Sequence, residues 1–207
     1  KAQETAAGHF QLFSIRKSSA TSPSSIHVLT DLPLCASCEK EMNEPSNRRF
    51  QYPFINCTEC GPRYTLIRQL PYDRVNTTMA AFVLCDDCQR EYETPTDRRF
   101  HAEPMACPAC GPQLSYQQAD SEIHDPEQAL LACVADLRQG KLIAVKGIGG
   151  YHLLCDARND EAVQHLRDRK QRPHKPLAVM MAETMLEAHV QVSSTERKLL
   201  RGTVHPI

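Results

Sequence analysis

Apolar and polar positions alternate with recognisable periods in the C-terminal half of the chain. Between residues 125 and 140, an N-cap aspartate, a proline at the first helical position and a closing glycine predict an amphipathic helix. The apolar run 142–145 predicts a buried strand, 147–150 a tight glycine turn, and 151–155 a second strand. Residues 160–170 again have a helical pattern.

The same alternation continues toward the C-terminus. Residues 175–181 predict a third strand, and two short helical patterns follow, the second capped by Ser193 with Glu196 three positions later. A further strand is expected at the very end. Strands that alternate with helices predict a mixed α/β sheet over residues 125–207.

The N-terminal stretch has only one periodic segment. Residues 10–15 alternate as a strand, and the serine-rich stretch 18–25 predicts a linker. Because a single strand is not stable alone, we expect residues 1–30 to complete a domain that precedes them. The chain begins with Lys1 and stops at Ile207, so we interpret it as a fragment of a longer protein.

The middle of the chain, residues 31–114, contains one motif twice at a spacing of 50 residues. The copies span residues 31–64 and 81–114. In each copy a Cys-x-x-Cys pair precedes an Arg-Arg-Phe segment, and a second Cys-x-x-Cys pair is followed by Gly-Pro. The first copy contributes Cys35, Cys38, Cys57 and Cys60, and the second contributes Cys85, Cys88, Cys107 and Cys110.

These cysteines have the spacing of structural zinc sites, with eighteen residues between the two pairs of each copy. Four thiolates fill every position of tetrahedral Zn²⁺ and leave none for substrate or water. We therefore expect two structural Zn²⁺ ions, which replace a core that so small a unit could hardly build. Disulfides are the disfavoured alternative. Ligand pairing within each copy is preferred, and pairing across the copies stays open.

Three other residues, His101, Cys133 and Cys155, are of types that can bind metal. His101 could displace a cysteine ligand, but Gln51 stands at the equivalent place in the first copy, so we expect an ordinary histidine. Cys133 and Cys155 lie in predicted regular elements and are expected to be small buried hydrophobes.

Charge disfavours nucleic acid as a partner. Arg48, Arg49, Arg98 and Arg99 flank phenylalanines and could contact phosphates and bases. Residues 31–114, however, hold nine basic and twelve acidic residues, and two zinc-thiolate centres would bring the net charge to about −7. We expect these arginines to bond within their own copy or to dock a neighbouring domain.

Targeting signals are also missing from the printed sequence. No apolar run approaches the roughly 20 residues of a membrane helix, and no signal peptide is recognisable. The prediction is a cytoplasmic protein without a membrane partner.

A basic segment at residues 167–175 places five Lys and Arg residues within nine positions. It predicts a phosphate site, although cations at a helix C-terminus also complement the helix dipole. Gly147, Gly149 and Gly150 would let backbone approach a ligand, but they lack the full dinucleotide fingerprint.

Three motifs, residues 52–65, 71–74 and 146–152, resemble the HypF family, carbamoyltransferases of [NiFe]-hydrogenase maturation. The resemblance implies an α+β multidomain fragment, in which tandem four-cysteine zinc-finger modules precede an incomplete YrdC-like twisted α/β sheet. By this resemblance, residues 1–30 are the end of an acylphosphatase-like domain and a linker, 31–114 the zinc-finger region, and 125–207 the N-terminal part of the YrdC-like domain.

The resemblance also implies the chemistry. Carbamoyl phosphate and ATP, with Mg²⁺, give carbamoyl adenylate, and the carbamoyl group passes to the C-terminal cysteine of a HypE-type partner for cyanide synthesis. Lys170 and Arg172 are similar to the Lys-x-Arg-Pro element that holds nucleotide and acyl group. Residues of second rank for the same pocket are Lys146, Gly149, Gly150, Tyr151, His152 and Lys175.

Two other functions remain open at this point. The first is a zinc-ribbon module that binds protein or nucleic acid without catalysis. The second is a relative of threonyl-carbamoyl adenylate synthase, which the tandem zinc modules disfavour. We expect the fragment alone to be inactive, since no catalytic residue is certain within it.

Overall fold

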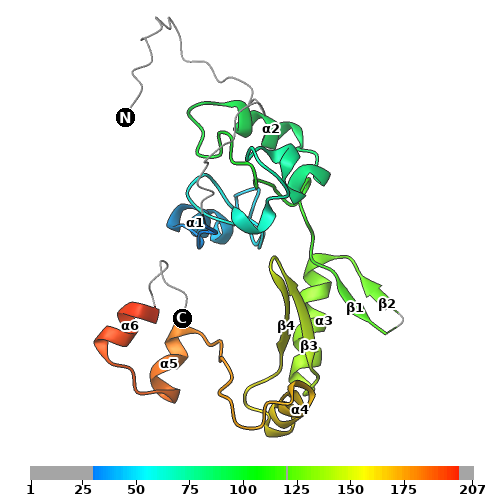
Figure 1. Cartoon of the computed structure of the whole chain (residues 1–207), viewed down its shortest axis with the longest axis vertical. Helices are drawn as coiled ribbons and strands as arrows, with labels where there is room; N and C mark the ends of the chain where they lie inside the picture. The colour runs from blue at the N-terminus through cyan, green and yellow to red at the C-terminus, as the bar shows by residue number, and fades with distance from the viewer. Residues whose placement is uncertain (1–29, 120, 201–207) are drawn as a thin grey trace, which may run out of the picture.

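The computed structural model describes residues 30–119 and 121–200. The strand predicted at residues 10–15 and the one expected at the C-terminus lie outside these ranges. The finger region, residues 31–114, and the α/β region, residues 115–200, are joined by a single stretch of chain (Figure 1). No helix among the described residues is both long and apolar enough to cross a bilayer.

The finger region has little regular structure. Each copy starts with one short helix, α1 (Ala36–Asn43) or α2 (Asp86–Glu93), whose N-cap is the first cysteine of that copy. The connection between the copies contains three 3₁₀ turns: η1 (Tyr64–Leu66), η2 (Arg74–Asn76) and η3 (Thr78–Ala81). Such short elements bury little surface, so the region depends on what holds its loops together.

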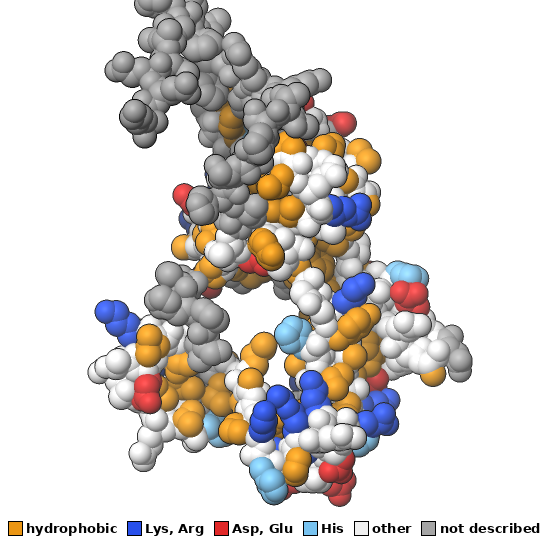
Figure 2. Space-filling view, viewed as in Figure 1, with side chains coloured by type: hydrophobic (Ala, Val, Ile, Leu, Met, Phe, Trp, Pro, Cys, Tyr) orange, Lys and Arg blue, Asp and Glu red, His pale blue; other side chains and the backbone are white. Residues whose placement is uncertain are grey.

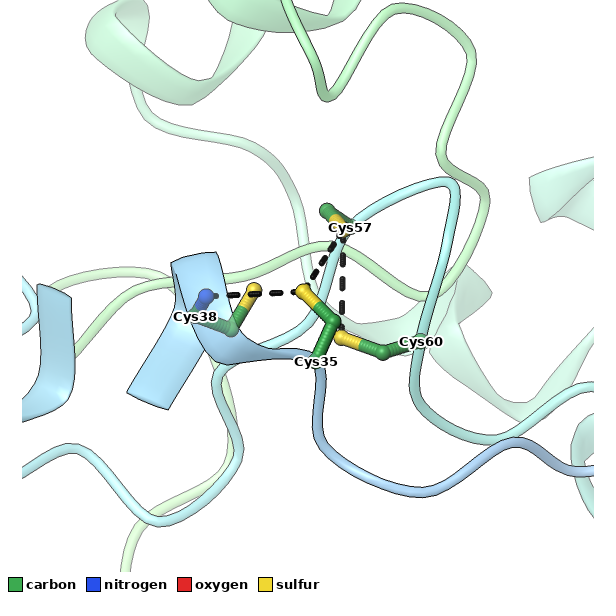
Figure 3. A group of neighbouring side chains, drawn as sticks. All are labelled: Cys35, Cys38, Cys57 and Cys60. Atoms are coloured by element: carbon green, nitrogen blue, oxygen red, sulfur yellow. Dashed lines mark hydrogen bonds between the residues drawn. The ribbon is translucent and has the colours of Figure 1, made fainter. Parts of the chain in front are cut away.

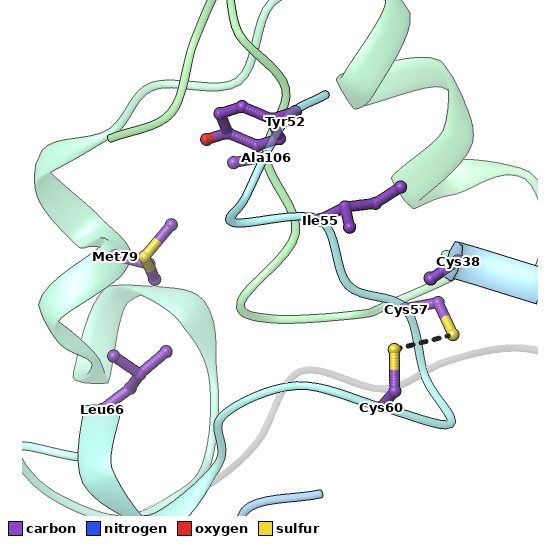
Figure 4. Packing of buried hydrophobic residues seen from close by; sticks show 8 residues of the cluster. All are labelled: Cys38, Tyr52, Ile55, Cys57, Cys60, Leu66, Met79 and Ala106. Carbon is purple, nitrogen blue, oxygen red and sulfur yellow. Dashed lines mark hydrogen bonds between the residues drawn. The ribbon is translucent and has the colours of Figure 1, made fainter. Parts of the chain in front are cut away.

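Cysteines form a large part of the finger cores. The first core gathers Cys38, Cys57 and Cys60 around a few apolar side chains, among them Ile55 and Met79 (Figure 4). The second core contains Cys88 and Cys107 with Ala102 and Met105. Ala106 of the second copy packs into the first core, so the two copies share one interior.

The α/β region contains most of the elements predicted there, but the strand predicted as buried over 142–145 is largely exposed. Helix α3 (Pro126–Arg138) begins at Asp125, whose carboxylate accepts a hydrogen bond from Gln128 N at 2.9 Å. Strands β3 (Ile143–Gly147) and β4 (Gly150–Leu154) pair antiparallel, with Gly147 opposite Gly150 across the predicted turn. The remaining helices are α4 (Asp160–Lys170), α5 (Glu183–His189) and α6 (Ser194–Leu200).

The capping box predicted for the last helix is also present. Glu196 N donates to Ser193 Oγ at 3.2 Å, while Ser193 N donates to Glu196 Oε2 at 2.8 Å. These two bonds satisfy backbone donors that the first turn of a helix leaves free.

The third predicted strand is wrong for the described structure. Residues 175–181 are not in a strand, because a strand needs a neighbour for its backbone groups and no described segment pairs with them. The structure instead has an antiparallel hairpin that the sequence pattern missed, β1 (Tyr116–Gln118) with β2 (Ser121–Ile123). Its residues are mostly polar, so they lack the apolar alternation that predicts a strand.

Candidate metal centres

The structure gathers the eight motif cysteines into two compact groups, one for each copy. Within each group all four Sγ atoms lie within 4.8 Å of one another. In the first group the sulfurs of Cys35, Cys38, Cys57 and Cys60 face a common centre, approached from α1 on one side and from the turn 57–60 on the other (Figure 3). The sulfurs of one copy are grouped together, and none joins the group of the other copy.

Sulfur separations match the edges of a metal-centred tetrahedron. Cys35 and Cys57 are 3.8 Å apart, and Cys57 and Cys60 are 3.8 Å apart. In the second group the two corresponding separations are both 3.7 Å, and Cys88 and Cys110 are 3.6 Å apart. Four sulfurs placed about 2.3 Å from a zinc ion would be roughly 3.8 Å apart, whereas a disulfide needs about 2.05 Å. The arrangement therefore fits two tetrathiolate sites and no disulfide.

Backbone N–H groups bond to two sulfurs of the first group. Cys38 N donates to Cys35 Sγ at 3.4 Å, and Glu59 N donates to Cys57 Sγ at 3.3 Å. Gly61 follows the second pair with φ +93°, a left-handed conformation in which an added Cβ would lie 2.5 Å from Asn56 Cβ. Glycine is the residue that both this turn and this close approach require.

The side chains of the arginine pairs do not bond within their own copy, which was one of the two expectations from the sequence; they bond to the opposite copy. Arg98 Nη2, from the second copy, donates to Cys38 Sγ of the first at 2.7 Å. Arg48 Nη2, from the first copy, donates to Cys88 Sγ of the second, also at 2.7 Å. Each sulfur group is thus contacted by a guanidinium of the other copy.

The second arginine of each pair is buried and also bonds to the opposite copy. Arg49 donates from Nε to Ala106 O at 2.9 Å and pairs with Glu91 at 2.5 Å. Arg99 donates from Nε to Asn56 O at 3.0 Å and pairs with Glu41. Their side chains are only 2% and 4% exposed. The arginines are held inside the contact between the copies.

Charge in this contact is balanced locally. Burial raises the pKa of Glu91, but the hydrogen bond and charge of Arg49 outweigh it and leave the pKa below its usual value. The pKa of Glu41 is lowered in the same way, with Arg99 overcoming the effect of burial. Both carboxylates are therefore ionised at neutral pH and hold the arginines that face the thiolates.

Sequence reasoning missed the roles of Glu41 and Glu91. The signal was available, because the two glutamates stand 50 positions apart, at the same place of each copy. His101 is an exposed residue whose ring lies 4.7 Å from those of Tyr92 and Phe100, centroid to centroid. It belongs to neither sulfur group.

The residues proposed for nucleotide binding fall into two groups. Lys146 lies opposite Tyr151 in the β3–β4 hairpin, with His152 next to it and Gly149 and Gly150 in and after the turn. The other group is the basic loop, residues 170–175, where Lys170 ends α4 and Arg172 and Lys175 are exposed. Figure 2 shows Lys and Arg side chains gathered over this part of the α/β region.

One arginine organises the backbone of the basic loop. Arg167 Nη1 donates to Arg172 O at 3.2 Å and to Lys175 O at 2.9 Å. Gln171 takes the left-handed conformation that ends α4, with φ 51°. No hydrogen bond or ion pair of the described residues joins this loop to the side chains of the hairpin.

Comparison with known proteins identifies the family. Residues 34–67 and 84–117 match the family described as HypF finger, and residues 135–206 match Sua5_yciO_yrdC, described as Telomere recombination. Carbamoyltransferase HypF of Synechocystis sp. is 55% identical over 200 residues, which are 96% of this chain and 26% of that protein. Carbamoyltransferase HypF2 of Cupriavidus necator is 50% identical over 91% of this chain and 24% of its own length.

Solved structures agree with the sequence relatives. The crystal structure of T. kodakarensis HypF superposes with a TM-score of 0.79 at 44% identity, over 89% of this chain and 24% of that one. A full-length HypF in a phosphate- and nucleotide-bound form gives a TM-score of 0.74 at 43% identity, over 85% of this chain and 23% of that one. The chain therefore belongs to the HypF family and spans about a quarter of the length of the relatives it matches.

Proposed function

We propose that each sulfur group binds one Zn²⁺ ion, with Cys35, Cys38, Cys57 and Cys60 as ligands of one ion and Cys85, Cys88, Cys107 and Cys110 as ligands of the other. The sulfur separations of 3.6 to 3.8 Å support this assignment. A set of four thiolates leaves no open position on the metal, so the zinc ions stabilise the fold and take no part in catalysis.

The chain then works as part of a HypF-type carbamoyltransferase. Identity of 55% over 96% of this chain is the observation that carries this proposal. Residues 1–30 are assigned to the end of an acylphosphatase-like domain and a linker, 31–114 to the zinc fingers and 125–207 to the start of a YrdC-like domain. The fingers act as a rigid spacer between catalytic domains.

The basic loop is proposed to hold the nucleotide and the carbamoyl group through Lys170 and Arg172. Formation of an acyl adenylate places charge on phosphoryl oxygens, and fixed cations directed at those oxygens lower its barrier. Arg172 adds a guanidinium fork, which grips phosphate in a bidentate manner. Arg167 supports this role because it holds the backbone on both sides of Pro173. ATP with Mg²⁺ would supply the adenylyl group and neutralise phosphate charge.

The hairpin residues are proposed as the other side of the same pocket. Lys146 and Lys175 add positive charge, Gly149 and Gly150 leave room for a ligand, and Tyr151 is 69% exposed. His152 is assigned a hydrogen-bonding role. One relative of known structure is described as phosphate- and nucleotide-bound, which supports a phosphate ligand for this family.

The carbamoyl acceptor is proposed to be the C-terminal cysteine of a HypE-type protein, and the location the cytoplasm. Reduced thiols are required at all eight zinc ligands, and the cytoplasm keeps thiols reduced. Nucleic acid is disfavoured as a partner, because Arg49 and Arg99 are buried while Arg48 and Arg98 face sulfur atoms.

A chimera tests the proposed function. The matching segment of Synechocystis HypF is replaced by this chain, and carbamoyl-phosphate-dependent exchange between ATP and pyrophosphate is measured. We expect the chimera to retain exchange, and a chimera with Lys170→Ala and Arg172→Ala to lose it. Arg138→Ala, which removes an exposed cation of α3 that is not among the proposed ligand-binding residues, is the matched control and should leave exchange unchanged. A folded chimera without exchange would contradict the assignment.

A further inference from the structure

Contacts between the two copies of the repeat are reciprocal. Arg48 reaches Cys88, and Arg98, 50 positions later, reaches Cys38, both at 2.7 Å. The same holds for the buried pair, since Ala106, the acceptor of Arg49, stands 50 positions after Asn56, the acceptor of Arg99. The fingers are therefore related by an approximate two-fold exchange, and each one completes the surroundings of the sulfur group of the other.

Electrostatics give this exchange a consequence for metal binding. A zinc ion with four thiolates carries a formal charge of −2, and two arginines from the opposite copy stand beside each group. Hydrogen bonds from charged donors to thiolates stabilise the deprotonated form that a metal needs. If the sulfur group beside it lost its negative charge, a buried guanidinium such as Arg49 would be only partly neutralised, which is unfavourable.

Each arginine pair follows the helix that starts at the first cysteine of its own copy. Helix α1 begins at Cys35, and the turns that follow it carry Arg48 and Arg49. Arg49 N donates to Asn47 Oδ1 at 2.9 Å, and Arg99 N donates to Asp97 Oδ1 at 2.7 Å, so both pairs are presented by the same local turn. A metal that fixes the start of the helix thereby fixes the arginines that contact the other group.

We propose that the two zinc sites are energetically coupled through these arginines, so that a metal ion in one site strengthens binding at the other. Arg48 and Arg98 act as positioning residues for the thiolates of the opposite copy. The inference rests on the proposed zinc occupancy of both sulfur groups, and the test below separates the two claims.

The two copies differ beside their second cysteine pairs, and we expect this difference to set the order of metal loss. Thr58 closes the first site, because its N–H and hydroxyl donate to Arg98 O at 3.3 and 3.1 Å. Pro108 takes the equivalent place in the second site and has no N–H to donate. A cavity of about 520 Å³ opens there beside Arg48, Cys85 and Cys107. The second site should therefore lose its metal first.

The test measures metal protection of each cysteine separately in the full chain. Zinc-loaded protein is treated with a chelator and a thiol-alkylating reagent, and mass spectrometry of peptides reports the alkylation rate of each cysteine. Arg48→Gln should raise the rates at Cys85 and Cys88 roughly fivefold or more, the lower range of typical coupling between sites. Arg98→Gln should act on Cys35 and Cys38 in the same way.

Matched variants separate coupling from general loosening. Arg68→Gln alters an exposed arginine between the two copies, outside both sulfur groups, and it should change no rate. Arg48→Lys keeps the charge and should restore part of the protection. Unfolding of the whole region would expose both sites equally, which is a different pattern from an effect on the opposite copy.

The outcomes decide the proposal. Acceleration at the opposite site, with the variant's own site affected less, shows that the arginines stabilise that site. Coupling of the two metals predicts in addition that Cys57→Ser, which removes a ligand of the first ion, accelerates alkylation at Cys85 and Cys88, and unchanged rates there would overturn the proposal. Unchanged rates in both arginine variants, or acceleration confined to the variant's own site, would overturn it. Zinc content of the unaltered chain is measured first, and fewer than two ions there would refute the proposed occupancy instead of the coupling.

Discussion

Arg49 and Arg99 show how single residues replace a conventional core in this protein. Each guanidinium is almost fully buried, yet its donors reach a carboxylate, a backbone carbonyl and a sulfur atom. Burying a charge is costly unless such partners are present, and here the partners come from the other copy of the repeat. The arginines therefore bind the copies together where apolar side chains are few.

Removing one of these arginines should be severe. We expect Arg49→Ala to lower the free energy of unfolding by about 3 kcal/mol, because Glu91 is left without its buried partner. Urea denaturation of the zinc-loaded chain measures the change. Arg90→Ala, whose side chain is 70% exposed, serves as control and should stay within about 0.5 kcal/mol of the unaltered chain. Equal effects of the two variants would contradict the role assigned to Arg49.

Residue types and spacing in the sequence predict the grouping of the cysteines, because Cys-x-x-Cys pairs have few other uses at this spacing. They do not predict which sulfur group each arginine side chain contacts. Arg48 and Arg98 occupy equivalent places, so the repeat reveals that they share a role, but only the packing of the copies decides which sulfur group each one meets. Charge counting disfavoured nucleic acid as a partner without locating the groups that the arginines contact.

Among the elements, helices and the tight hairpin follow local rules and were predicted well. Caps at Asp125 and Ser193 fix two helix starts through bonds within a few residues of each other. Segment 175–181 has the apolar composition of a strand, yet composition cannot supply the partner strand that its backbone requires. The hairpin β1–β2 was not predicted, because its strands pair without the apolar alternation by which a strand is recognised in a sequence.

Gly140 ends α3 in a conformation that favours glycine, with φ +79°. An added Cβ would also lie 2.8 Å from Asn159 Nδ2, and Asn159 is the residue that caps α4. Gly140→Ala should therefore lower the free energy of unfolding by about 1 kcal/mol. Gly149→Ala is the matched control, since no atom lies within 4 Å of its added Cβ. Thermal denaturation compares the two, and a larger loss at Gly149 would disprove this reasoning.

Asp136, in α3, accepts hydrogen bonds from residues that lie before and after the helix in the chain. Hydrogen bonds from Lys141, Tyr116 and Gln118, together with the charge of Lys141, hold the pKa of Asp136 at about 2, below the usual 3.8. A lowered pKa means that the ionised carboxylate stabilises the fold above pH 3.8 and that this contribution is lost as the pH falls toward 2.

The stability difference between the unaltered chain and Asp136→Asn isolates that contribution. We expect the difference to be constant above pH 3.8 and to shrink as the pH approaches 2. Denaturant titrations at several pH values measure it, and zinc loss at low pH affects both proteins alike. A difference independent of pH over this range would show that the carboxylate charge is not what matters.

At the scale of the whole molecule, two regions of different construction are joined in one chain. The finger region depends on sulfur groups and exchanged arginines, whereas the α/β region has ordinary helices and two two-stranded hairpins. Several apolar side chains of the β3–β4 hairpin are exposed, among them Val145, Leu153 and Leu154. The matched relatives are about four times longer, so the chain accounts for one part of a larger HypF architecture.

Metal analysis tests the central claim most directly. Native mass spectrometry of the purified chain should find two zinc ions per molecule, and all eight motif cysteines should resist alkylation until a chelator removes the metal. Removal should also abolish the protection of finger amides from hydrogen exchange while α3 and α4 keep theirs. A chain without bound zinc, or fingers that keep their protection after all eight cysteines are replaced by serine, would contradict the account.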